Sequence, residues 1–116
     1  MSSDDLTARL RREQQSTLAL ALAMEADLRA VVESSAGSNA DDEHDPEGAT
    51  IAFERSRLAT LIAGSRTRLA EITIALDRVG TGEHGRCAVC GQGIGAERLE
   101  ARPFALLCLD CAAAAS

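Results

Sequence analysis

The first half of the chain repeats apolar side chains with the period of an α-helix. From Leu6 to Val32, one position in every seven lies on a common stripe, occupied by Leu10, Thr17, Met24 and Val31. Such spacing gathers these side chains on one face of a helix, where they can be buried together. The pattern predicts a long amphipathic helix, with Ser3 as its N-cap.

A second stretch, from residue 46 to residue 80, carries a cleaner heptad repeat. One heptad position is occupied by Ile51, Leu58, Ser65, Ile72 and Val79, and its partner by Ile62, Leu69 and Leu76. Pro46 suits the first turn of a helix, where its missing N–H is harmless, and Asp45 before it is a suitable N-cap. Gly80 and Gly82 are expected to end this second helix.

Small, polar and acidic residues from 34 to 45 separate the two helices and predict a loop. Each helical stretch is about 33 residues, hence about 50 Å long at 1.5 Å per residue. Similar lengths and a short connection predict an antiparallel coiled-coil hairpin over residues 1–80, with its tip at 37–47. Leu18 and Leu22 lie off the main stripe and leave extra apolar surface, so pairing of helices between two chains, as a homodimer, is the alternative.

The tip is strongly acidic. Five carboxylates fall within seven positions, at Asp41, Asp42, Glu43, Asp45 and Glu47. The simplest interpretation is a solvated loop. The functional interpretation is that a slim hairpin carries a charged end into a place that a globular domain cannot reach, where carboxylates meet basic residues or a metal ion.

The chemistry of the chain is concentrated in two C-x-x-C pairs near its C-terminus. Cys87 and Cys90 are separated by seventeen residues from Cys108 and Cys111. Two such pairs can place four thiolates around one tetrahedral Zn²⁺, and Gly91 permits the positive φ of a tight metal-binding turn. A closed shell of four cysteines leaves no open position for a substrate, so we expect a structural metal in a small module over residues 81–116.

Other uses of the cysteines are less consistent with the sequence. Disulfides need an oxidising compartment, and no secretory signal pattern precedes them, which favours a cytoplasmic protein. A redox C-x-x-C belongs in a βαβ pattern that is missing here, and iron–sulfur clusters use other spacings. We therefore predict one structural Zn²⁺ and no enzymatic activity.

Composition narrows the classes of partner. The 116-residue chain has two aromatic residues and a net charge of −6, and all twelve basic residues are arginine. The negative charge argues against a general nucleic-acid binder, although Arg78, Arg86, Arg98 and Arg102 surround the metal site. No apolar run approaches the ~20 residues of a membrane span.

The residues around the cysteines resemble the DksA/TraR family of bacterial transcription regulators. The resemblance lies in Gly82-Glu-His-Gly85-Arg-Cys87-Ala-Val-Cys90-Gly91, Ile94, Arg98-Leu99-Glu-Ala101-Arg-Pro103 and Cys108-Leu-Asp-Cys111. It implies a protein that binds RNA polymerase directly, inserts its coiled coil into the secondary channel and does not bind promoter DNA. Leu99 and Phe104 are expected to form a tiny core against the metal.

The tip departs from the family motif Asp-x-x-Asp-x-Ala. One register aligns Asp42 and Asp45 with the two aspartates and ends in Glu47, whereas the other starts at Asp45 and puts Gly48 and Thr50 at the later positions. We predict that Asp42, Asp45 and Glu47 contact the polymerase. The competing hypothesis is a zinc-stabilised dimeric scaffold without effect on polymerase.

Overall fold

The computed structural model describes residues 2–36 and 46–115, and its regular elements there are all helices. The long helices are α1, Ser3–Ala36, and α2, Pro46–Thr81. Two short helices follow in the cysteine-rich segment, α3 at Ala96–Ala101 and α4 at Leu109–Ala115. Within the described residues the only β-pairing is an isolated antiparallel bridge between Arg86 and Gly93. The mainly helical fold expected from the sequence is confirmed.

The ends of the long helices agree closely with the local signals. The N-cap of α1 is one residue earlier than predicted, because the Ser2 hydroxyl, not that of Ser3, accepts a hydrogen bond from the Asp5 N–H at 3.1 Å. Helix α2 starts at Pro46 as expected. It ends at Thr81, and Gly82 follows with φ of 80°, a conformation that favours glycine.

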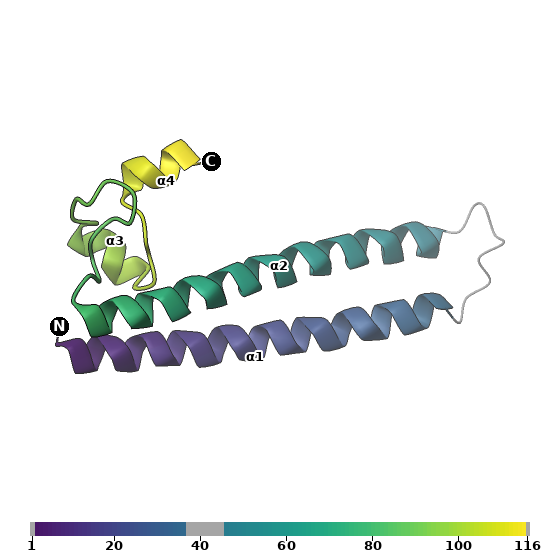
Figure 1. Ribbon diagram of the computed structural model, residues 1–116. Coiled ribbons are helices and arrows are strands. Elements are labelled where there is room, and N and C mark those ends of the chain that lie inside the picture. The colour runs from purple at the N-terminus through teal and green to yellow at the C-terminus, as the bar shows by residue number, and fades with distance from the viewer. Residues whose placement is uncertain (1, 37–45, 116) are drawn as a thin grey trace. The chain divides into compact units, whose positions relative to one another are not determined.

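The helices α1 and α2 lie side by side and run in opposite directions (Figure 1). The chain divides into two compact units, residues 1–16 with 68–116, called here the base unit, and residues 17–67, called the distal unit. Each unit contains a part of both long helices and has its own core. The predicted division of the chain at residue 80 stays a prediction.

The core of the base unit joins the helices to the cysteine-rich segment. Leu10 of α1 and Ile72 and Ala75 of α2 are buried together with Phe104, which comes from the segment after α3. Phe104 is only 4% exposed. The prediction that Phe104 packs in the metal module's own core is therefore wrong. Its ring packs instead against the apolar side chains between α1 and α2.

The core of the distal unit contains only the two long helices. Met24 of α1 packs with Leu58 and Ile62 of α2, and Leu28 and Val31 cover this cluster. An ion pair between Glu25 and Arg66, 2.8 Å apart, links the helices on one side. The heptad residues predicted to face inward thus do so here.

The heptad pattern did not identify two small residues that are buried in the interface. Ala21 and Ala75 are buried, at 3% and 0% exposure, although alanine carries little signal in a hydrophobic pattern. Leu20 is next to the main stripe in sequence but is 55% exposed. Leu18 and Leu22 also stay exposed, as leftover apolar surface. In the part of the chain that the structure describes, no helix is long and apolar enough to cross a membrane.

Candidate metal centre

The four cysteines converge on one point of the base unit. Their Sγ atoms all lie within 4.8 Å of one another, and those of Cys90 and Cys108 are 3.8 Å apart. A tetrahedral ion with Zn–S bonds of 2.3 Å requires sulfur atoms about 3.8 Å apart. The thiols therefore fit the coordination shell of Zn²⁺ with little adjustment.

The first cysteine pair lies on a tight loop that is closed by backbone hydrogen bonds. The Cys87 N–H donates to the Gln92 carbonyl at 2.7 Å, and the Gly91 N–H donates to the Cys87 carbonyl at 3.0 Å. Gly91 has φ of 76°, as the sequence predicted. Below the loop, the Ile94 N–H donates to the Gly85 carbonyl at 2.8 Å. These bonds hold Cys87 and Cys90 on the same side of the turn.

The second pair lies at the start of α4. Cys108 precedes this helix, and its sulfur accepts a hydrogen bond from the Cys111 N–H at 3.4 Å. It thus occupies the place that a serine or aspartate takes at many helix N-termini. The Ala88 N–H donates to the Leu106 carbonyl at 2.8 Å, which ties the first loop to the chain leading into the second pair.

A small apolar cluster supports the thiols from below. Cys87, Ile94 and Ala105 are buried there, and Leu99 and Leu107 pack against them. The predicted role of Leu99 is confirmed. Gly85 has φ of 88°, and a Cβ at this position would lie 3.4 Å from Leu99 Cδ1. The turn before the first ligand therefore needs glycine for its conformation and for its close contact with the cluster.

In the metal-free protein the surroundings shift the pKa values of three thiols in different directions. Backbone N–H groups of Cys90 and Cys108 lower the pKa of Cys87 to about 6. Neighbouring thiols, first Cys108 and then Cys87, raise the pKa of Cys111 to about 12. The pKa of Cys90 is also raised: the Gln92 N–H lowers it, but burial and the adjacent thiols outweigh this. A divalent cation at the centre would offset the repulsion between neighbouring thiolates, because it stabilises all four thiolates together.

The arginines around the metal centre are engaged in structural contacts. Arg78 donates to the carbonyls of Glu83 and Arg86, and Arg98 donates to the Leu107 carbonyl at 2.9 Å. The guanidinium of Arg102 lies 5.2 Å from the centroid of the Phe104 ring, as does that of Arg68. These contacts tie α2 and the segments around α3 together, a role that sequence reasoning did not foresee.

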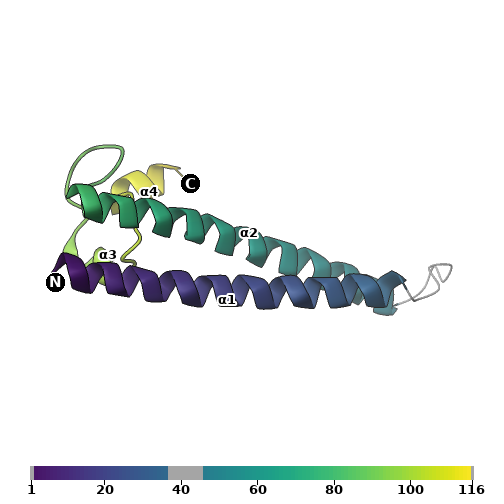
Figure 2. The ribbon, with the colours of Figure 1, turned by 60° about the horizontal axis from the view of Figure 1, so that its bottom comes forward.

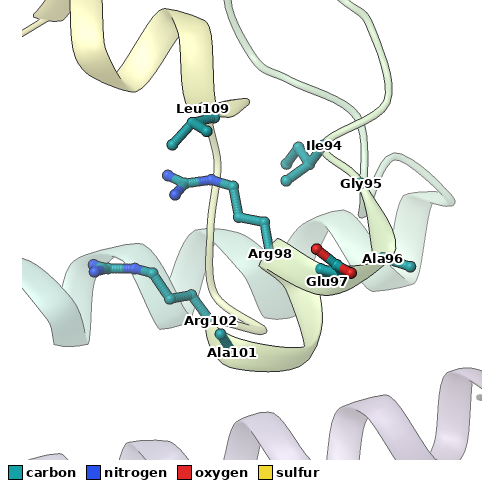
Figure 3. A pocket seen from close by; sticks show the side chains of 8 residues that line it. All are labelled: Ile94, Gly95, Ala96, Glu97, Arg98, Ala101, Arg102 and Leu109. Atoms are coloured by element: carbon teal, nitrogen blue, oxygen red, sulfur yellow. The ribbon is translucent and has the colours of Figure 1, made fainter.

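Beside α3, a surface hollow of about 520 Å³ is lined by both apolar and charged side chains. Figure 3 shows Arg98 reaching from α3 toward Leu109 at the start of α4, with Ile94 across from it. The Arg98 side chain spans this hollow to reach the Leu107 carbonyl. Its guanidinium thereby braces the chain just before Cys108.

The predicted tip residues are not part of this centre. Asp42 and Asp45 lie outside the described residues, and Glu47 falls in the first turn of α2 with no described side chain. Their role in binding a partner stays a prediction.

Comparison with known proteins gives the same assignment for the cysteine-rich segment. Residues 80–116 match the model of the prokaryotic dksA/traR C4-type zinc finger. The chain is 46% identical over 46 residues to the RNA polymerase-binding transcription factor DksA of Haemophilus influenzae, covering 40% of this chain and 32% of that protein. The DksA of Escherichia coli K12 is equally similar, with 40% and 30% covered. The match thus spans about a third of the length of these curated relatives.

A solved structure extends the similarity to the hairpin. The transcription factor DksA2 from Pseudomonas aeruginosa superposes with a TM-score of 0.72 at 25% identity, over 97% of this chain and 81% of that one. The zinc-finger model and the four clustered thiols both indicate a zinc site. The cysteine-rich segment is similar to the zinc finger of the DksA/TraR family, and its four cysteines form a C4-type site for one structural zinc ion.

Proposed function

We propose that this protein regulates transcription by binding RNA polymerase directly and inserting the hairpin tip into the secondary channel. The observation that carries the proposal is the likeness to DksA2, which covers the hairpin as well as the zinc finger. The two curated relatives are named RNA polymerase-binding transcription factors, which supports a regulatory and non-enzymatic role. The cytoplasm is the compartment in which such a regulator would act.

The zinc ion has a structural role in this proposal. Four thiolates close its shell, so the metal offers no position for a substrate or water. It would link the turn at Cys87 and Cys90 to the segment at Cys108 and Cys111, and the chain that leads from α3 to Cys108 carries Phe104 into the core of the base unit. Zinc thereby stabilises the base unit.

Direct DNA binding is not part of the proposal. The net charge is −6, whereas nonspecific DNA binding depends on a basic surface that releases counterions. Arg78 and Arg98 near the metal donate to backbone carbonyls, and Arg86 lies 3.8 Å from the Glu83 carboxylate. An acidic protein suits a basic channel better than a phosphate backbone.

The first test is binding to core RNA polymerase at low salt, followed by localisation of the tip. Fe²⁺ replacing Mg²⁺ at the polymerase active centre reduces added hydrogen peroxide to hydroxide and hydroxyl radicals, which cleave nearby protein backbone. We expect cleavage of this chain within residues 37–47, and loss of that cleavage when residues 38–49 are deleted. Failure to bind core polymerase, or cleavage confined to the zinc finger, would overturn the proposal.

A second experiment distinguishes the two registers of the tip. Asp42→Asn and Asp45→Asn each remove one carboxylate, and Asp41→Asn is a matched control that belongs to neither register. We expect Asp45→Asn to retain polymerase binding and to change transcript yield, because Asp45 belongs to both registers. An effect of Asp42→Asn as well would select the register that begins at Asp42. Equal effects of all three variants would indicate that only total charge matters.

A further inference from the structure

The four cysteines of the metal centre differ in how firmly the fold holds them. Cys87 is buried, at 2% exposure, in the apolar cluster beneath the thiols, and Cys108 and Cys111 are half-buried against that cluster. Cys90 is exposed, and in the described part of the chain no apolar cluster includes it. The other thiols lie within 4.8 Å of its sulfur and cover it from the side of the metal. One ligand therefore lacks the packing that supports the other three.

Cys90 lies on the outer side of its turn. The residues on either side of it, Val89 and Gly91, are also exposed, Val89 at 73%. The backbone bonds that close the turn involve Cys87 instead, because its N–H donates to the Gln92 carbonyl and its carbonyl accepts from the Gly91 N–H. The Cys90 side chain can therefore rotate away from the other thiols while the turn stays closed.

The second pair is fixed by the helix that carries it. In both views the loop after α2 lies beside the start of α4, which brings the two pairs together (Figures 1 and 2). The Cys111 N–H donates to the Cys108 sulfur at 3.4 Å, and Arg98 donates to the Leu107 carbonyl at 2.9 Å. Movement of either sulfur would disturb the start of α4 or uncover the apolar cluster. The site thus combines three fixed ligands with one movable ligand.

Exchange of a metal from a closed shell of four thiolates requires an external ligand to reach it. Zinc accepts a fifth ligand transiently, so a thiol from solvent can bind before a protein sulfur leaves. The incoming thiol gives up its proton as it binds, and the departing protein sulfur takes up a proton, so the total charge is unchanged and no electron is transferred. Entry and departure are both easiest at the exposed ligand, because neither requires the apolar cluster to open.

We propose that Cys90 is the exchangeable ligand of the zinc site, displaced by a small thiol from solvent while Cys87, Cys108 and Cys111 retain the metal. This edge of the site is then the route by which zinc enters and leaves the folded protein. The inference does not depend on the proposed function, because exchange is measured on the isolated protein without polymerase.

Limited alkylation of the zinc-loaded protein tests which ligand is accessible. With substoichiometric N-ethylmaleimide, peptide mapping should find the label on Cys90 at least about tenfold more often than on Cys87, since thiol reactivity follows exposure. Native mass spectrometry should show that the singly labelled protein still holds zinc. A first label on any other cysteine, or fully labelled protein with no singly labelled form, would refute the proposal.

Zinc transfer to a chromophoric chelator tests the exchange itself, with 2-mercaptoethanol as the small thiol. In the wild type the transfer rate should rise with thiol concentration. Cys90→Ser should keep its zinc and lose this dependence, because the exchangeable thiolate is gone. The matched control Cys108→Ser makes the same change in the second pair and should bind zinc about tenfold more weakly than Cys90→Ser. A thiol-independent rate in the wild type, or equal zinc affinities of the two variants, would contradict the proposal.

Discussion

The base unit and the distal unit are built from the same two helices but are held together differently. In the base unit, Phe104 from the zinc finger adds a third segment to the core of Leu10, Ile72 and Ala75. In the distal unit only two helices contribute, around Met24, Leu58 and Ile62. A two-helix seam leaves one side of each helix in solvent, whereas a third segment and a metal ion cover more apolar surface. The zinc finger therefore stabilises the base unit by adding a third segment to its core.

Removal of zinc should produce the largest difference in stability between the base unit and the distal unit. Chelation, or Cys87→Ser, removes a metal whose apparent binding free energy is on the order of 10 kcal/mol in zinc fingers. We expect residues 82–115 to lose protection in hydrogen exchange and Phe104 to leave the core, while amides of residues 17–33 and 51–67 keep most of theirs. A control with chelator pre-loaded with zinc should change nothing. Complete loss of protection in the distal unit would show that its stability depends on the zinc finger.

Zinc affinity should fall steeply as the pH falls. The raised pKa values of Cys90 and Cys111 mean that both thiols carry protons at pH 7 in the metal-free protein, and zinc must displace them. Each displaced proton changes the affinity about tenfold per pH unit, so two predict at least a hundredfold loss between pH 7 and pH 6. Below pH 6 the slope should steepen, because Cys87, with a pKa of about 6, becomes protonated as well.

Competition with a chromophoric chelator across pH 5.5–8 measures how the logarithm of the zinc affinity changes with pH. Calorimetry in buffers of different ionisation enthalpy counts the protons released on binding. A slope of one or less would show that the thiols near the metal are already ionised without it.

Phe104→Ala should destabilise the base unit by about 3–5 kcal/mol, as buried phenylalanine truncations do. The variant leaves a cavity beside Leu10 and Ile72 and removes the ring that Arg68 and Arg102 contact. The matched control is Phe53→Ala, since Phe53 is 71% exposed and its loss should cost less than about 0.5 kcal/mol. Urea unfolding followed by circular dichroism measures both. Equal effects of the two variants would contradict the assigned core.

Gly64→Ala should stabilise the distal unit slightly, by about 0.5–1 kcal/mol. Gly64 lies within α2, and a Cβ added there meets no atom within 4 Å. The contrasting variant is Gly82→Ala in the base unit, which should destabilise because Gly82 has φ of 80°. Thermal unfolding measures the stability of the two variants. Destabilisation by Gly64→Ala would contradict the prediction and would indicate that the methyl group meets a neighbouring side chain.

Much of the fold was predictable from local patterns. Heptad spacing located both long helices, Pro46 marked the start of α2, and Gly82 and Gly91 marked positions with positive φ. The two C-x-x-C pairs predicted the metal centre, because four thiolates at this spacing have few other uses. These signals are local: each depends on a few neighbouring residues and on the geometry of one turn or one helix face.

The burial of small residues and the ion pairs between helices could not be predicted from the sequence, because they depend on which segments come into contact. The burial of Ala21 and Ala75 follows from close approach of two helices, and no hydrophobic pattern identifies alanine as a core residue. The ion pair between Glu25 of α1 and Arg66 of α2 depends on the alignment of the two helices. Leu20 was left exposed because the seam passes through Ala21 and Met24.

The two long helices, the chemistry of the metal centre and the resemblance to the DksA/TraR finger could be predicted from sequence, because periodicity and ligand spacing act over short distances along the chain. Only the tertiary structure decided that Phe104 belongs to the hairpin's core and that Arg78 and Arg98 bind backbone carbonyls. Burial and hydrogen bonding at these residues depend on segments distant in sequence, and their partners exist only after the chain has folded.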